Sequence, residues 1–190
     1  MKRIGILGGT FNPVHIGHLA MAQTALEQLK LDKVIFVPSN LPPHKASKEV
    51  VSAMHRFKMV QLAVKGNPKF EVSSVEIKRS GKSYSIDTVK YFKKLYLKGD
   101  QIFFIIGEDT LKTLHSWKYI KELLKSVKFV SINRLGYQNT KSKVKTVSIK
   151  MPALEVASSY IRQRLVSKKT VRYLIPDLVL KYIQKNKLYV

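Results

Sequence analysis

Two histidines three residues apart, His15 and His18, stand where a glycine turn meets a helical pattern. Residues 8–18 read Gly-Gly-Thr-Phe-Asn-Pro-Val-His-Ile-Gly-His, between an apolar run typical of a strand and a helix expected over 17–29. Glycines let the backbone approach an anion closely, and a helix start presents N–H groups at the positive end of its dipole. Because imidazole N–H groups can also donate to phosphate oxygens, the stretch predicts a phosphate site. The alternative is a glycine turn in an α/β core that carries two surface histidines.

The stretch matches neither of the two common glycine-rich phosphate motifs. The Walker loop needs Gly-Lys-Ser/Thr and the dinucleotide turn needs Gly-x-Gly-x-x-Gly, whereas the glycines here stand at 5, 8 and 9. All eleven positions instead resemble the nucleotidyltransferase signature, Gly-Gly-Thr-Phe-Asp/Asn-Pro-x-His-x-Gly-His, with asparagine at position 12. The resemblance implies that ATP is bound here, with His18 nearest the reacting phosphorus. The implied ATP-binding residues of this stretch are Gly8, Gly9, Thr10, Phe11, His15 and His18.

Beyond this signature, the chain resembles the nicotinate-nucleotide adenylyltransferases of the bacterial NAD pathway nearly from end to end. The matching stretches are Pro38-Ser39, Pro42-Pro43-His44-Lys45, His55-Arg56, residues 76–79, residues 81–85, residues 106–109, Trp117, Arg134, residues 158–162, Pro176, residues 182–183 and residues 188–189. The resemblance implies transfer of the adenylyl group of ATP to nicotinate mononucleotide, which gives nicotinate adenine dinucleotide and pyrophosphate. It also implies Mg²⁺ as a cofactor, bound together with ATP.

The resemblance assigns catalytic roles to two cations besides the histidines. Lys45, which follows His44 in a Pro-Pro-His-Lys loop, would lie between the two nucleotides and bind the mononucleotide with His44; the alternative is one loop lysine among many. Arg162 would bind ATP phosphate from the first turns of a helix, with Ser158 as its cap or as a ligand. Simple capping beside a surface arginine is the alternative. The chain departs from the family at Ala157, where serine is usual.

Other residues would recognise the nicotinate ring and a ribose. In the family the aromatic at Trp117 stacks on the pyridine ring, although a single tryptophan equally suits a core. The backbone N–H groups of Tyr84 and Ser85, at an expected helix start, would receive the nicotinate carboxylate. Asp109 would accept the hydroxyls of a ribose, with a helix cap as the alternative reading. Glu108 stands before it where the family usually has a small residue.

The elements that must position these residues alternate between strand and helix patterns. Strands are expected over 3–7, 34–37, 70–78, 102–106, 127–132 and 144–149, and helices over 17–29, 51–65, 83–97, 158–166 and 176–185, with short helices within 110–125. The run at 102–106 is apolar on both faces and is typical of a buried strand. The order predicts an α/β fold: a Rossmann-like, doubly wound, mostly parallel sheet with helices on both faces, as one nucleotidyltransferase domain over 1–190.

The candidate residues fall after strands. In open α/β sheets ligands bind beyond the carboxyl ends of the strands. Loops 8–18 and 38–45 follow the first two strands, residues 107–109 follow the buried strand, and Arg134 follows the next one. We therefore expect these loops to converge at one edge, where Gly107 and Arg134 would join the ATP site.

Composition excludes several classes of protein. The 190 residues include no cysteine, so disulfides and thiolate metal sites are excluded and a reducing compartment fits. No apolar run is long enough to span a bilayer, and the N-terminus lacks the apolar stretch of a secretory signal. A cytoplasmic protein without a membrane partner is expected. No protein-bound metal is expected either, because the paired histidines lack a third ligand nearby in sequence.

The charge leaves more than one partner open. The chain has 35 Lys and Arg against 12 Asp and Glu, a formal net charge of +23. Such a field draws in anions, from nucleotides to nucleic acid. The lysines are scattered, and no nucleic-acid-binding motif is present, so nucleic acid is not expected. The rivals to the nicotinate reading are an adenylyltransferase for another phosphate monoester, such as phosphopantetheine, and a basic nucleic-acid-binding protein without catalysis. A homo-oligomer stays open.

Overall fold

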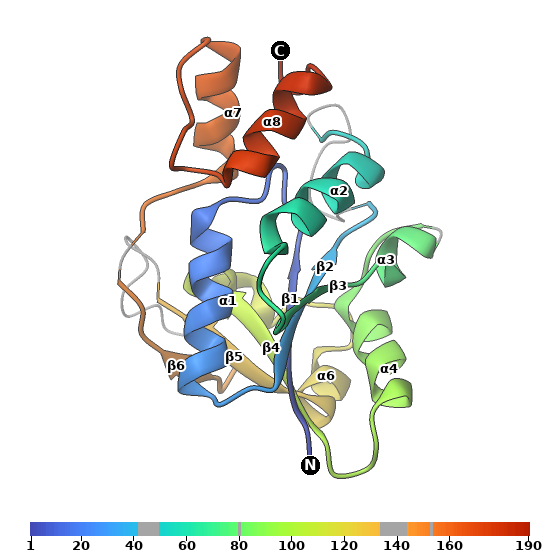
Figure 1. Cartoon of the computed structure of the whole chain (residues 1–190). Helices are drawn as coiled ribbons and strands as arrows, with labels where there is room; N and C mark the ends of the chain where they lie inside the picture. The colour runs from blue at the N-terminus through green and yellow to red at the C-terminus, as the bar shows by residue number, and fades with distance from the viewer. Residues whose placement is uncertain (42–49, 80, 134–143, 153) are drawn as a thin grey trace.

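Within the described part of the chain, six parallel strands form one sheet in the order β3-β2-β1-β4-β5-β6 (Figure 1). The computed structural model describes residues 1–41, 50–79, 81–133, 144–152 and 154–190. The strands are β1 (Arg3–Gly9), β2 (Lys33–Pro38), β3 (Phe70–Val72), β4 (Gln101–Gly107), β5 (Lys128–Ile132) and β6 (Val147–Ile149). The order reverses between β1 and β4, as in a Rossmann-type sheet. The prediction of this fold class is confirmed.

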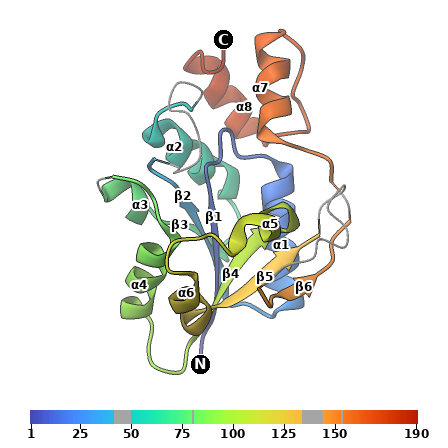
Figure 2. The ribbon, with the colours of Figure 1, turned by 180° about the vertical axis from the view of Figure 1, so that it is seen from behind.

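Helices cover both faces of the sheet. They are α1 (Ile16–Gln28), α2 (Ala53–Val64), α3 (Val75–Lys78), α4 (Ser85–Leu95), α5 (Leu111–Leu114), α6 (Ile120–Ser126), α7 (Ser158–Val166) and α8 (Asp177–Lys185), with a 3-10 turn η2 at Glu108–Thr110. Figure 1 shows α1 and α2 in front of the sheet, and Figure 2 shows α5 and α6 in front when the molecule is seen from behind. Helices α7 and α8 lie above the loop that joins β1 to α1.

Each face of the sheet carries its own hydrophobic core. Alternation along β4 sends Phe103 and Ile105 into the core beneath α1, α2 and α8, and Phe104 and Ile106 into the core beneath α4, α5 and α6. Successive side chains of a strand point to opposite faces, so a strand buried on both sides must be apolar throughout. The buried strand expected at 102–106 is confirmed. Each such side chain stabilises the fold by about 1.5–3 kcal/mol.

One predicted element is wrong. The strand expected over 70–78 ends at Val72, and residues 75–78 form the short helix α3. The neighbouring strand β2 ends at Pro38, and its last partner on this side is Phe36, which pairs with Val72. The Ser73 N–H still donates to the Phe36 oxygen at 2.9 Å, but Pro38, which ends β2, has no N–H with which to extend the pairing. The chain then forms α3, in which the Glu76 side chain is buried. The strand expected over 144–149 is also shorter in the structure, at 147–149.

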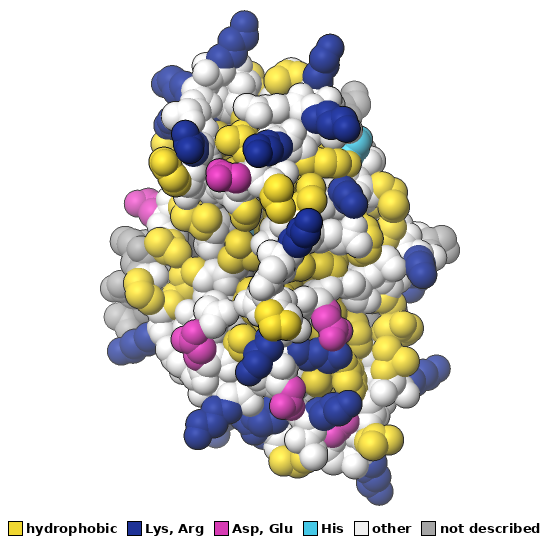
Figure 3. All heavy atoms as spheres, viewed as in Figure 1, with side chains coloured by type: hydrophobic (Ala, Val, Ile, Leu, Met, Phe, Trp, Pro, Cys, Tyr) yellow, Lys and Arg dark blue, Asp and Glu magenta, His cyan; other side chains and the backbone are white. Residues whose placement is uncertain are grey.

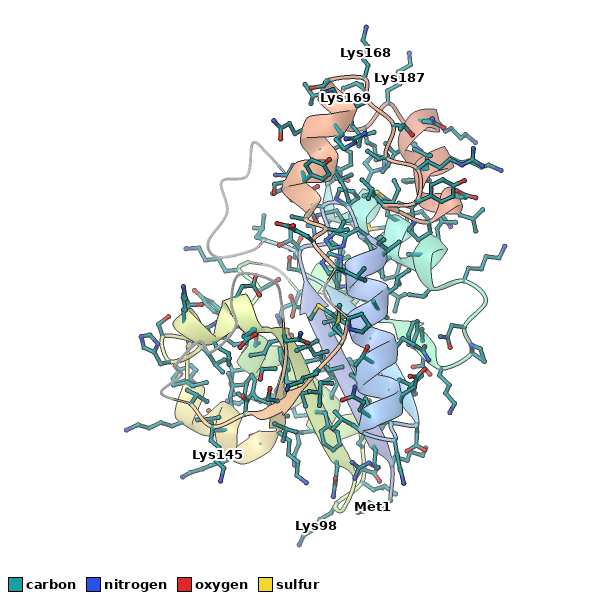
Figure 4. The ribbon with its side chains drawn as sticks, turned by 90° about the vertical axis from the view of Figure 1, so that its left-hand side faces the viewer. Met1, Lys98, Lys145, Lys168, Lys169 and Lys187 are labelled. Atoms are coloured by element: carbon teal, nitrogen blue, oxygen red, sulfur yellow. The ribbon has the colours of Figure 1, made fainter. Side chains whose placement is uncertain are left out.

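Positive charge is spread over the surface instead of gathering on one element. In Figure 4, Lys168, Lys169 and Lys187 point outward at one end of the molecule, while Met1 and Lys98 lie at the other. Figure 3 shows lysine and arginine side chains distributed over the whole visible face. Within the described ranges, two ion pairs join a lysine to a glutamate: Lys33–Glu71 at 2.8 Å and Lys90–Glu122 at 3.0 Å. No helix in the described part of the chain is long and apolar enough to cross a membrane.

Candidate active site

A cavity of about 570 Å³ opens at the carboxyl ends of β1 and β4, where the strand order reverses. This switch point is where open α/β sheets bind ligands. The predicted site residues that line it are Gly8, Gly9, Thr10, His18, Tyr84, Ser85, Gly107, Asp109 and Trp117. Side chains that the sequence reasoning did not single out also line it, among them Met21, Ser39, Glu76, Ser83, Phe104, Ser116 and Lys118. The cavity thus joins the phosphate loop to the start of α4.

The turn after β1 is shaped by close packing. Phe11 has φ +50° and is 1% exposed, and its ring lies edge-on to His18 with centroids 4.9 Å apart. A Cβ on Gly9 would lie 2.9 Å from the Phe11 ring, so only glycine fits there. Phe11 therefore packs against the His18 ring. The Phe11 side chain is buried in the core and does not line the cavity. If Phe11 contacts ATP, as the sequence predicts, the contact must come from its backbone.

The two histidines form a stacked pair at the start of α1. His15 precedes the helix and is 5% exposed, and the two imidazole centroids are 3.7 Å apart. The backbone N–H of His15 donates to Nδ1 of His18 at 3.2 Å. A neutral His18 whose Nδ1 accepts carries its proton on Nε2. No acidic residue stands in the first turn of α1, so the positive end of the dipole is not neutralised there. His18 is thus set to donate to an anion in the cavity.

Asn12 fixes the far side of the same loop. It is 2% exposed, and its Oδ1 accepts from the Tyr189 hydroxyl at 2.8 Å and from the Val51 N–H at 3.3 Å. Its backbone oxygen accepts from Arg162 Nη1 at 2.9 Å. Burial raises the pKa of Tyr189 above its ordinary range, so this hydroxyl remains a donor. Arg162 therefore contacts the loop at Asn12 and does not line the cavity.

Ser158 also contacts this loop, through its hydroxyl, which donates to the Pro13 oxygen at 2.9 Å. The cap of α7 is Ala157, with extended backbone, and Ser158 is the first helical residue. The reading of Ser158 as the helix cap is wrong, because the cap position falls one residue earlier. The departure at Ala157 thus lies at the cap itself.

Replacing Tyr189 by phenylalanine is expected to lower the free energy of unfolding by about 1 kcal/mol, the usual worth of one hydrogen bond. A tyrosine whose pKa is raised in the fold contributes fully below the ordinary pKa of about 10 and loses that contribution at higher pH. The deficit should therefore be the same at pH 6 and pH 9, measured by urea denaturation. A deficit that vanished at pH 9 would contradict the assignment.

Arg56 is a buried residue for which the sequence indicated no role beyond the family resemblance at His55-Arg56. It is 1% exposed and donates from Nε to the Val51 oxygen at 3.0 Å and from Nη2 to the Asn40 oxygen at 2.8 Å. Nη1 donates to the oxygens of Thr10 at 2.8 Å and Ser39 at 2.6 Å. Burial lowers the pKa of its guanidinium. One side chain therefore joins the loop after β1 to the loop after β2. An arginine within a helical pattern gives no sequence signal of this role.

The opposite wall is aromatic. Trp117 is partly buried and packs edge-on against Phe104, with centroids 5.9 Å apart, and against Phe129 at 6.1 Å. It packs against the core and also lines the cavity, so the core reading holds, and stacking on the pyridine ring stays a prediction. Tyr84 precedes α4 and Ser85 begins it. The Lys118 ammonium lies 4.4 Å from the Tyr84 ring centroid, which adds positive charge to this wall.

Asp109 lies beside Gly107 at the end of β4. A Cβ at Gly107 would come within 2.4 Å of the Asp109 Oδ1, so the carboxylate lies against the backbone only because glycine is there. The cap of α5 is Thr110, not Asp109, which removes the capping alternative for this aspartate. Asp109 and Gly107 both line the cavity.

Three predicted residues, His44, Lys45 and Arg134, lie outside the described residues. Among those that the structure does describe, no three His, Cys, Asp or Glu side chains are grouped closely enough to hold a metal ion. The described site thus consists of the glycine turn, the histidine pair, Asp109 and the aromatic wall.

Comparisons with known proteins agree with this geometry. A family model described as cytidylyltransferase-like matches residues 6–164. The chain is 43% identical over 189 residues to the nicotinate-nucleotide adenylyltransferase of Bacillus subtilis (strain 168), covering 100% of this chain and 99% of that protein. It is 44% identical over 188 residues to a probable nicotinate-nucleotide adenylyltransferase of Lactiplantibacillus plantarum, covering 99% of this chain and 88% of that protein.

Solved structures show the same fold. The nicotinic acid mononucleotide adenylyltransferase of Plasmodium falciparum, solved in complex with NaAD, superposes with a TM-score of 0.82 at 22% identity, covering 100% of this chain and 98% of that one. At this identity the solved structure supports the fold alone, whereas the sequence relatives support the family. With a family model over most of its length and relatives above 40% identity from end to end, this chain belongs to the cytidylyltransferase-like nucleotidyltransferases and, within them, to the nicotinate-nucleotide adenylyltransferase family.

Proposed function

We propose that the protein transfers the adenylyl group of ATP to nicotinate mononucleotide, forming nicotinate adenine dinucleotide and pyrophosphate in NAD biosynthesis. The observation that supports this best is one cavity lined both by His18, on the phosphate loop, and by Trp117 and the start of α4. A site that joins two nucleotides needs an anion-binding part and a part that recognises a ring within reach of each other.

The reaction is a displacement at the α-phosphorus of ATP. An oxygen of the mononucleotide phosphate forms the new P–O bond, and the bond to pyrophosphate breaks with its electron pair. Catalysis of this kind depends on positioning and on stabilising the charge that develops. His18 would donate through Nε2 to a phosphate oxygen, since its Nδ1 accepts from the His15 backbone. His15 would support the ring of His18, and the backbone of residues 8–10 would approach the phosphates.

Arg162, Lys45 and Arg134 would supply the remaining positive charge. Arg162 holds the Asn12 oxygen through Nη1, so it would keep the loop in place as well as act on the phosphates. Lys45, with His44, would lie between the two nucleotides, as the family resemblance implies, and Arg134 would act on ATP. Ser158 would contribute through the loop, because its hydroxyl donates to Pro13.

The mononucleotide would occupy the aromatic wall. Its pyridine ring would stack on Trp117, and its carboxylate would receive the N–H groups of Tyr84 and Ser85. The positive end of the α4 dipole favours a carboxylate over a neutral amide at that place. Asp109 would accept the hydroxyls of a ribose, since its carboxylate lies beside Gly107 at the cavity.

Mg²⁺ would enter with ATP. The described residues provide no cluster of metal ligands, and Asp109 and Glu76 are separate carboxyl groups on the cavity wall. This donor set fits an ion that is held by phosphate oxygens and water, as Mg²⁺ commonly is. When bound, the ion neutralises phosphate charge. The protein would hold the phosphates through His18 and the glycine turn.

A pyrophosphate-release assay tests the proposal. The protein, with ATP and Mg²⁺, is given nicotinate mononucleotide, nicotinamide mononucleotide or phosphopantetheine in parallel. We expect turnover with nicotinate mononucleotide and at least tenfold lower kcat/KM with the amide, since a charge-assisted bond to backbone N–H groups is worth about 1.5–3 kcal/mol. Release with phosphopantetheine alone would favour the other phosphate-monoester reading. Salt-sensitive binding of RNA or duplex DNA with no release would contradict any transferase role.

A further inference from the structure

Glu76 is a buried acid on the cavity wall that the proposed mechanism does not use. It stands in α3, is 7% exposed and lines the cavity together with Ser83, Tyr84 and Ser85. Among the described residues it is the one acidic side chain in the buried class. A carboxyl is costly to bury unless donors satisfy it. The groups that bind this carboxyl therefore indicate which part of the structure it stabilises.

The partners are hydroxyl groups of the segment that forms this wall. Thr88 Oγ1, itself 1% exposed, donates to Glu76 Oε1. Hydrogen bonding from Thr88 and Ser83, with the nearby charge of Arg79, lowers the pKa of the carboxyl, while burial, the larger effect, raises it. Arg79 Nη2 also approaches Thr88 Oγ1, at 3.4 Å. One carboxyl thus restrains residues on both sides of the start of α4.

Ser83 extends the connection to the loop after β2. Its Oγ accepts from the Asn40 N–H at 2.9 Å, and its N–H donates to the Leu41 oxygen at 3.0 Å. Asn40 Nδ2 donates to the Arg79 oxygen at 3.2 Å. Arg56 in turn holds the Asn40 oxygen. Buried and partly buried polar groups from three segments therefore brace the start of α4, with Asn40 joining Ser83, Arg79 and Arg56, and Glu76 holding Thr88.

We propose that Glu76 is a positioning residue that sets the affinity for the mononucleotide by fixing the backbone N–H groups of Tyr84 and Ser85 toward the cavity. The proposal rests on the proposed function. Glu76 accepts from Thr88 Oγ1, which follows Ser85, and Ser83, which precedes Tyr84, is held by its bonds with Asn40 and Leu41. Without the carboxyl, Thr88 loses its acceptor and the N–H groups at the start of α4 can reorient. The phosphate loop is anchored by bonds that Glu76 does not make, from Arg56 to Thr10 and from Arg162 and Tyr189 to Asn12, so it should keep its geometry.

Steady-state kinetics of Glu76→Ala, Glu76→Gln and the wild type test this. We expect Glu76→Ala to raise KM for nicotinate mononucleotide about tenfold, which corresponds to about 1.4 kcal/mol, with KM for ATP and kcat changed less than threefold. Glu76→Gln keeps an amide oxygen as acceptor and should restore most of the affinity. Glu71→Gln, an exposed acid on the neighbouring strand, is the matched control and should not change either KM.

The sole tryptophan gives a second readout, because quenching of Trp117 fluorescence reports mononucleotide binding without turnover. If Glu76→Ala does not fold, Thr88→Val removes one of the two donors with little change of shape and should weaken binding in the same direction. An unchanged mononucleotide KM, or equal increases in both KM values, overturns the proposal. Wild-type protein that does not use nicotinate mononucleotide at all would instead overturn the proposed function, so the two failures are distinguishable.

Discussion

Replacing His18 by alanine is expected to lower kcat by about 10²–10³-fold, the usual cost of losing one preorganised donor to developing charge. The effect on KM for ATP should be smaller, because the backbone of residues 8–10 would still approach the phosphates. The bond from the His15 N–H to His18 Nδ1 at 3.2 Å directs Nε2 outward, and Phe11 packs edge-on to the ring. The measurement is initial-rate pyrophosphate release with ATP and nicotinate mononucleotide both varied.

His115→Ala is the matched control for this variant. His115 is exposed and follows α5, so its loss should leave kcat within twofold of the wild type. His18→Gln, which keeps an N–H donor, should recover part of the rate. Turnover of His18→Ala equal to that of the control would remove His18 from the reaction and leave the stacked pair as a packing feature.

Arg56→Ala is expected to lower the free energy of unfolding by about 3 kcal/mol or more. Four backbone oxygens lose their donor, those of Thr10, Ser39, Asn40 and Val51. Each buried group left unpaired costs about 1–3 kcal/mol, partly recovered if water enters. For a chain of this size a loss of about 3 kcal/mol lowers Tm by roughly 6–12 °C. Urea and thermal denaturation give both quantities.

Arg56→Lys should recover little of this stability. Lysine presents its donors from one nitrogen, whereas the arginine plane reaches carbonyls on several segments from three nitrogens. Arg172→Ala is the control, because Arg172 is exposed and its loss should stay within about 0.5 kcal/mol. A loss for Arg56→Ala no larger than that of the control would mean that the loops after β1 and β2 hold their shape without it.

Patterns of local sequence predict the frame of this site well. The run at 102–106 is apolar at every position, which only a strand covered on both faces requires, and β4 is that strand. The eleven residues at 8–18 join a strand to a helix, as their glycines and histidines indicate. Parallel strands end at one edge, so Gly8, Gly107 and Asp109 had to approach one another. These inferences need only the hydrophobic pattern, the residue types in the turn and the direction of the strands.

Long-range partners are what the sequence conceals. Residues 70–78 alternate well enough for a strand, yet pairing with β2 stops at Phe36, and the proline that ends β2 without an N–H donor lies in a different segment. Arg56 and Glu76 are charged residues of types that usually lie at the solvated surface, yet both are buried. Arg56 binds carbonyls of loops up to 46 residues away, and Glu76 binds Thr88 on α4, 12 residues along the chain. Neither burial nor partner is encoded within a few residues of either one. The cap of α7 was misplaced by one residue for the opposite reason, since helix ends are set by fine local geometry.

The bond between Tyr189 and Asn12 spans 177 positions of the chain. At a synthesis rate of about 5–20 residues per second, the ribosome needs roughly 9–35 s to make the second partner after the first. The nascent polypeptide therefore contains the whole of residues 8–18 long before the tyrosine that anchors this loop has been translated. The loop at Asn12 can therefore gain this anchor only after residues up to 189 have been made, although the loop itself is among the first residues made.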